Sequence, residues 1–134
     1  SAWSPPTEEL SKRLGYQPDP KPSIHEARRL LAEAGYAKGL KGVDFLVRDA
    51  PDLKLRAEAI QVMLKEALNI EANLRTVQIS AWFDDAQAGN FDLTIGAIVS
   101  TLMDPSDYFQ AWYSKDGPQN YAKWHSVSTL PATD

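Results

Sequence analysis

The sequence predicts an α/β fold, a small and mainly parallel sheet with crossover helices. Two observations predict it: segments with apolar residues at helical spacing alternate with short segments rich in β-branched and aromatic residues, and strands separated by helices usually pair in parallel. The chain has 134 residues, 43% of them hydrophobic, which suits one domain or a piece of a larger one. The expected order places residues 43–47 in the middle strand, with parallel neighbours on both sides and a right-handed crossover.

The composition along the sequence divides the chain into three segments. Residues 1–22 are a proline-rich lead-in in which only residues 7–14 could form a helix or turn, residues 23–115 are the α/β core, and residues 116–134 are irregular. In the core, Ser23 and Glu26 have the spacing of a capping box and predict a helix that ends at Gly35. A strand over 43–47 follows, and Pro51 ends it.

The second helix is predicted over residues 52–68, because its apolar residues recur every three or four positions. Asn69 ends it, and residues 70–77 alternate as a strand does. Ser80 is expected to cap a third helix that closes at Gly89. Residues 91–99 are the most continuously apolar run, which predicts a strand covered on both faces. Asp104 and Pro105 are expected to open a last helix that carries several aromatic residues.

Composition and motifs argue against several functions. The net charge is −4 and the basic residues are scattered, which argues against nucleic acid and anionic membranes as partners. The longest apolar run is far shorter than the roughly 20 residues of a membrane span, so no direct membrane insertion is expected. The chain has no cysteine, and its two histidines form no ligand motif. We therefore expect no metal and no cofactor.

Acidic pairs are the remaining catalytic candidates. Asp84 with Asp85, and Asp104 with Asp107, could act as acid and base, but both pairs are interpreted as acidic first turns of helices. No catalytic residue is assigned, and the protein is not expected to be an enzyme. A binding site is expected in the loop after residues 91–99, since ligands of α/β sheets bind beyond the carboxyl ends of the strands.

The order of five motifs resembles the C-terminal lobe of the extracellular solute-binding proteins of family 5, which serve oligopeptide, dipeptide and nickel ABC importers. The motifs are Ala27–Tyr36, Ala59–Lys65, Ile70–Leu74, Gly89–Leu93 and Asp104-Pro105. The resemblance implies part of one lobe of a two-lobed periplasmic binding protein of type II-like fold. It also implies a periplasmic or extracellular location, with a lipid anchor as an option in the full-length protein, and a membrane permease as partner.

The family's ligand loop maps onto Ala97 to Pro105. Peptide-binding members resemble Gly-Trp-x-x-Asp there, whereas this sequence has Ala97, Ile98 and Thr101 in place of the glycine, the tryptophan and the ammonium-binding aspartate. The resemblance thus implies a small solute that is neutral or differently charged, such as a modified peptide, an opine-like compound or an oligosaccharide. The predicted ligand-binding residues are Ala97, Ile98, Ser100, Thr101, Asp104, Tyr108 and Trp112.

Two other functions are compatible with the sequence. One is a stand-alone regulatory α/β domain that binds a small molecule, and the other is a small α/β enzyme, which would need a nucleophile and a base. The first predicts tight binding by this chain alone. A lobe fragment predicts weak binding, because a cleft between two lobes loses most of its buried ligand area when one lobe is missing.

Overall fold

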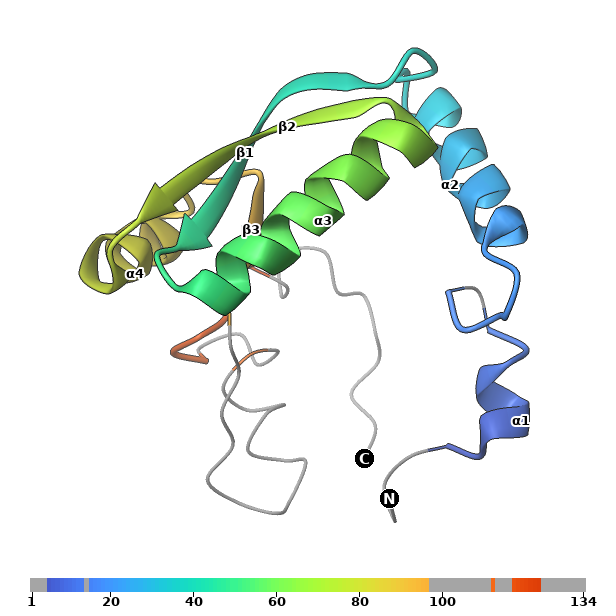
Figure 1. The fold of residues 1–134 in the computed structure, drawn as a ribbon, viewed down its shortest axis with the longest axis horizontal. Coiled ribbons are helices and arrows are strands. Elements are labelled where there is room, and N and C mark those ends of the chain that lie inside the picture. The colour runs from blue at the N-terminus through green and yellow to red at the C-terminus, as the bar shows by residue number, and fades with distance from the viewer. Residues whose placement is uncertain (1–4, 14, 97–111, 113–116, 124–134) are drawn as a thin grey trace.

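The computed structural model describes residues 5–13, 15–96, 112 and 117–123 (Figure 1). The described elements alternate helix and strand after a short first helix: α1 (Thr7–Leu10), α2 (Lys21–Glu33), β1 (Leu40–Arg48), α3 (Pro51–Leu68), β2 (Ile70–Val77), α4 (Ile79–Ala88) and β3 (Leu93–Ile95). Within the part of the chain that the structure describes, no helix combines the length and the apolar character needed to cross a membrane.

The sheet has the order β2-β1-β3, and β1 is parallel to both neighbours. Phe45 pairs with Leu74 on one side and with Leu93 on the other. The register slips between Lys41 and Val43, where β1 carries one extra residue relative to β2. The predicted parallel α/β sheet with its middle strand at residues 43–47 is therefore confirmed.

Both faces of β1 are covered by helices. Phe45 and Val47 pack against Leu53 and Ala57 of α3, which runs along β1 and β2 (Figure 1). Leu46, pointing the opposite way, packs against Trp82 and Ala86 of α4. Because successive side chains of a strand alternate between faces, this one strand anchors two separate apolar clusters.

Two predicted helix starts are wrong. Helix α2 begins at Lys21, with Pro22 in its first turn, and no side chain caps it; the hydroxyl of Ser23 instead accepts a hydrogen bond from the backbone N–H of Gly15, at 2.9 Å. Helix α4 begins at Ile79, so Ser80 lies inside it and does not cap it. Both helices therefore start one or two residues before the hydroxyl side chain, at Lys21 and Ile79.

The apolar run over residues 91–99 also differs from its prediction. Only Leu93–Ile95 form a strand among the described residues, and that strand lies at the edge of the described sheet. The strand covered on both faces is β1, although its mixed sequence, with Asp44 and Arg48 beside apolar residues, lacks the continuous apolar run typical of such a strand. Residues 97–99 and the helix expected from Asp104 lie outside the described residues.

The predicted helix ends are confirmed at all three places. Gly35, Asn69 and Gly89 have φ values of 89°, 55° and 77°, the left-handed conformation that follows a helix. After α2, the backbone N–H of Tyr36 donates to Leu31 at 2.7 Å and that of Gly35 donates to Ala32 at 3.0 Å, the two bonds of a Schellman motif.

Another left-handed glycine, Gly39, lies where two segments approach each other closely. Its φ is +87°, and a Cβ atom there would lie 2.1 Å from the carbonyl oxygen of Asn69. We expect Gly39→Ala to lower the free energy of unfolding by about 3 kcal/mol or more, since the added methyl group would collide with the backbone of Asn69. Thermal or denaturant unfolding measures this change.

Gly35→Ala is the matched control, because its φ is +89° and nothing lies within 4 Å of an added Cβ. It should lower the stability by only about 1 kcal/mol, the cost of a left-handed alanine. Equal losses in the two variants would show that the approach of Gly39 to Asn69 is unimportant.

Candidate functional site

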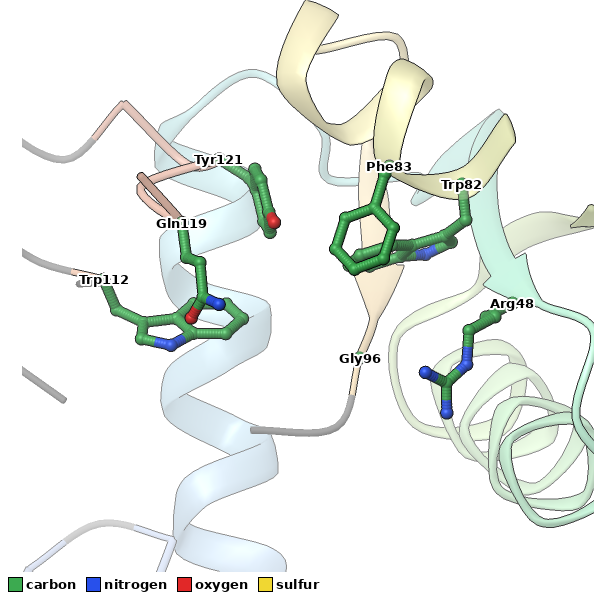
Figure 2. A pocket seen from close by; sticks show the side chains of 7 residues that line it. All are labelled: Arg48, Trp82, Phe83, Gly96, Trp112, Gln119 and Tyr121. Atoms are coloured by element: carbon green, nitrogen blue, oxygen red, sulfur yellow. The ribbon is translucent and has the colours of Figure 1, made fainter. Parts of the chain in front are cut away.

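A cavity lies where β1 and β3 end, at the carboxyl edge of the parallel sheet (Figure 2). Its volume is about 50 Å³, enough for a small polar group or a few water molecules but not for a whole peptide. Seven residues from five parts of the chain line it: Arg48, Trp82, Phe83, Gly96, Trp112, Gln119 and Tyr121.

Each wall of the cavity follows from the fold. Arg48 is the last residue of β1 and shares a face with Leu46, which places its side chain on the α4 side of the sheet. Trp82 and Phe83 come from α4. Gly96 directly follows β3, and a Cβ atom there would lie 3.2 Å from two ring carbons of Trp82. The absence of a side chain at Gly96 therefore lets the indole ring lie against the end of β3.

Aromatic rings form one side of the cavity in edge-to-face contact. Tyr121 lies 5.6 Å from both Trp82 and Trp112, with interplanar angles of 88° and 83°. Phe83 lies 5.2 Å from Trp82 at 78°. Such T-shaped pairs are favourable because the positive edge of one ring meets the negative face of the next. The cluster ties residues 112 and 121 to α4.

The indole of Trp82 is also anchored to the sheet by hydrogen bonds. Its Nε1–H donates to the hydroxyl of Thr94 at 3.1 Å, and that hydroxyl donates to the carbonyl oxygen of Leu46 at 3.0 Å. Trp82 is only 5% exposed, so its N–H needs a partner. Thr94 thus connects α4, β3 and β1 directly behind the cavity.

Arg48 is the charged member of the cavity lining. It is half-buried, and among the residues that the structure describes its guanidinium has no hydrogen bond or ion pair. The adjacent carboxylate, Asp49, is bound by Lys54 at 2.6 Å and by Gln78 at 2.8 Å. The Lys54 ammonium holds the pKa of Asp49 below its usual range, so Asp49 stays ionised and committed to that pair.

Every other arginine of the chain has a partner. Arg13, Arg29, Arg56 and Arg75 each pair with a carboxylate, and Arg28 donates to the carbonyl oxygen of Ala67. A partly desolvated guanidinium favours an anion that accepts several of its N–H groups. The position of Arg48 in a cavity therefore suits an anionic ligand group.

Two further polar groups line the same cavity. Burial raises the pKa of the Tyr121 hydroxyl, which keeps that group protonated and able to donate. Gln119 contributes a side-chain amide. Among the residues that the structure describes, no group of three or more His, Asp or Glu side chains could hold a metal ion. The cavity lining thus offers hydrogen-bond donors beside aromatic rings, a combination that suits a carboxylate attached to an apolar group.

The predicted site residues coincide with this cavity at one position. Trp112 lines it and is half-buried. The other six lie outside the described residues, and their role stays a prediction: Ala97, Ile98, Ser100, Thr101, Asp104 and Tyr108. Gly96, which precedes the predicted loop, is part of the lining.

The interpretation of Asp84 and Asp85 as an acidic first turn is wrong. Helix α4 starts at Ile79, so both residues lie in its second half. Asp85 accepts a hydrogen bond from Arg75 at 2.5 Å, and this guanidinium lowers the pKa of Asp85. Its role is therefore an ion pair with β2. Asp104 and Asp107 lie outside the described residues.

Sequence reasoning missed Arg48, the most informative residue of the lining. The rule that ligands bind at the carboxyl ends of parallel strands was applied to the last strand alone, although β1 ends at the same edge. Applied to each strand, it would have found an arginine as the last residue of the middle one. Gln119 and Tyr121 had no comparable signal, because residues 116–134 show no periodicity.

The sequence of residues 1–120 matches the family model described as bacterial extracellular solute-binding proteins, family 5 (middle region). No curated protein matches the sequence significantly.

Three solved structures illustrate the similarity in fold. The murein tripeptide binding protein MppA of Escherichia coli is 23% identical with a TM-score of 0.74, over 82% of this chain and 22% of that one. OppA of Haemophilus influenzae in complex with RPPGFSPFR is 24% identical with a TM-score of 0.72, over 88% and 24%. DppA of Helicobacter pylori in complex with the peptide STSA is 21% identical with a TM-score of 0.66, over 86% and 22%.

At this identity the similarity shows the fold, that of part of one lobe of a two-lobed periplasmic binding protein. The chain spans less than a quarter of the length of each of these three proteins.

The hydrogen bonds of Thr94 lead to a test of the cavity wall. Thr94→Val keeps the shape of the side chain but leaves the Trp82 N–H and the Leu46 carbonyl without their partner. We expect the free energy of unfolding to fall by about 2 kcal/mol, measured by denaturant unfolding. Thr94→Ser retains the hydroxyl and should lose clearly less. A valine variant as stable as the serine variant would argue against the hydrogen-bonded anchor.

Proposed function

Because the chain belongs to the bacterial extracellular solute-binding proteins of family 5, we propose that it forms part of one lobe of a protein that captures a solute for an ABC importer. The cavity at the ends of β1 and β3 is then a subsite of the ligand cleft, the part that this lobe contributes. A volume of about 50 Å³ suits one end of a solute, with the remainder of the ligand lying outside the subsite.

Similar proteins support capture of a peptide-like solute. Solved structures with the same fold include OppA with a nine-residue peptide and DppA with a four-residue peptide. MppA is described as a murein tripeptide binding protein. A partner permease in the membrane and a periplasmic or extracellular location, with a lipid anchor where the full-length protein carries one, complete the proposal.

The observation that carries the proposal is the guanidinium of Arg48 in a cavity at the carboxyl edge of the sheet. A half-buried positive charge without a protein partner among the described residues favours a ligand with a carboxylate. Arginine binds carboxylates through two parallel N–H groups, which fixes the orientation of the ligand as well as its charge. The ligand class is thus a carboxylate-bearing solute, bound by that end in this subsite.

The sequence adds a second property of the ligand. Where the family's peptide-binding members have an aspartate for the peptide ammonium, this chain has Thr101. An ammonium buried without a carboxylate is costly. We therefore propose a solute with a carboxylate and without a required free amine, such as a modified peptide or an opine-like compound.

Arg48 supplies the first test, on the full-length protein. We expect an N-acetylated dipeptide with a free carboxyl terminus to bind more tightly than its carboxamide by about tenfold or more, the worth of one charge-assisted pair. Arg48→Gln should abolish this preference and Arg48→Lys should keep part of it. Isothermal titration measures both affinities. A preference that survives in Arg48→Gln would place the anion elsewhere.

N-acetylation supplies the second test, again on the full-length protein. If no carboxylate receives an ammonium at Thr101, a dipeptide and its N-acetylated form should compete for the site with similar affinity, within about threefold. Competition binding compares the two. Loss of tight binding on acetylation would show that a free amine is recognised, and the use of Thr101 in the proposal would be wrong.

A further inference from the structure

We propose that Arg75 is a positioning residue of the ligand subsite: its guanidinium bonds directly to β1 and α4 and, through Asp44, helps to fix the start of β3. These three elements provide Arg48, Trp82 with Phe83, and Gly96. The inference rests on the proposed function, because it assigns a role to Arg75 in binding at that subsite.

The first contact of Arg75 is with β1. Its Nε lies 3.1 Å from both carboxylate oxygens of Asp44, and its Nη2 lies 2.8 Å from Asp44 Oδ2. Asp44 is four residues before Arg48 on the same strand, so both side chains lie on the same face. Arg75 therefore bonds to the strand that ends at the charged wall of the subsite.

The second contact is with α4 and the turn after it. The Nη1 of Arg75 donates to Asp85 Oδ2 at 2.5 Å, and its Nη2 donates to the carbonyl oxygen of Asn90 at 2.5 Å. Asp85 is one helical turn after Trp82 and lies two residues after Phe83. The side-chain amide of Asn90 also donates to Asp85, at 3.3 Å. The guanidinium thus fixes the helix that provides the aromatic wall.

Asp92 connects the start of β3 to the same point of β1. Its backbone N–H donates to the carbonyl oxygen of Asp44 at 3.1 Å, and its carboxylate accepts the backbone N–H of Asp44 at 2.8 Å. Asp44 is therefore shared: its side chain binds Arg75, and its backbone holds the segment that leads to Gly96. All three walls meet at one ion-pair network on the α4 face of the sheet.

Only arginine can make these contacts together. The planar guanidinium directs its N–H groups to Asp44 on one edge and to Asp85 and Asn90 on the other. Lysine keeps the charge, but its single ammonium lacks this planar fork. Arg75→Lys therefore tests position while leaving charge unchanged.

The experiment uses the ligand-free full-length protein with acetate as the probe, since acetate is the smallest carboxylate that presents an alkyl group. Acetate is titrated while the indole N–H resonance of Trp82, assigned from its loss in Trp82→Phe, is followed by NMR. We expect a weak saturable shift in the wild type. Arg75→Lys should raise the dissociation constant about tenfold, and Asp85→Asn, which removes only the negative charge that faces Arg75 from α4, by a smaller factor.

Arg29→Lys is the matched control. Arg29 also pairs with two carboxylates, Glu26 and Glu33, but on the surface of α2 away from the cavity. The acetate affinity of the Arg29→Lys protein should stay within about twofold of that of the wild type. Thermal unfolding of every variant shows that binding is compared between folded proteins, and Asp85→Asn keeps the test available if Arg75→Lys does not fold.

The outcomes separate the two proposals. Wild-type acetate affinity in folded Arg75→Lys and Asp85→Asn would overturn the positioning role and leave the subsite intact, provided that Arg48→Gln loses acetate binding. If acetate causes no shift in the wild type, or a shift that persists in Arg48→Gln, the anionic subsite is overturned, and the positioning role with it. Weakened binding in both network variants, with unchanged binding in Arg29→Lys, is the result expected.

Discussion

The burial of one strand on both faces is the constraint on which the rest of the structure depends. Phe45, Leu46 and Val47 are at most 1% exposed, and consecutive side chains of a strand point in opposite directions. The sheet therefore needs a helix on each side, which α3 and α4 provide. Once β1 is central and its neighbours are parallel, the carboxyl ends of β1 and β3 share one edge, and the cavity forms there.

The fold was predictable from the sequence because its signals are local. The apolar period of α3, the β-branched strands and the helix ends at Gly35 and Gly89 depend on residues close in sequence. The failures have a different cause. A hydroxyl residue near a helix start, such as Ser23, resembles a cap, yet its hydroxyl accepts a hydrogen bond from Gly15, eight residues earlier in the chain. Such a contact depends on tertiary structure and has no local signature.

The candidate site was predictable in its location at the carboxyl edge of the sheet and in one lining residue, Trp112. Arg48 stands out because it has no partner among the described residues while the chain's other arginines do, and partners cannot be read from composition. The network of Arg75 joins β2 to Asp85 on the next helix and to Asp44 on β1, 31 residues earlier in the chain. Asp85 was assigned to a first helical turn because α4 was expected to start later than it does.

The two apolar clusters on opposite faces of β1 have a consequence for how ligand preference can evolve. Only the cluster around Leu46 and Trp82 borders the cavity, whereas the cluster around Phe45 and Leu53 packs on the opposite face, against α3. Substitutions at the proposed subsite can therefore alter the cavity while the α3 side keeps this part of the chain folded. The lining of the cavity and the larger apolar core can thus change independently of each other.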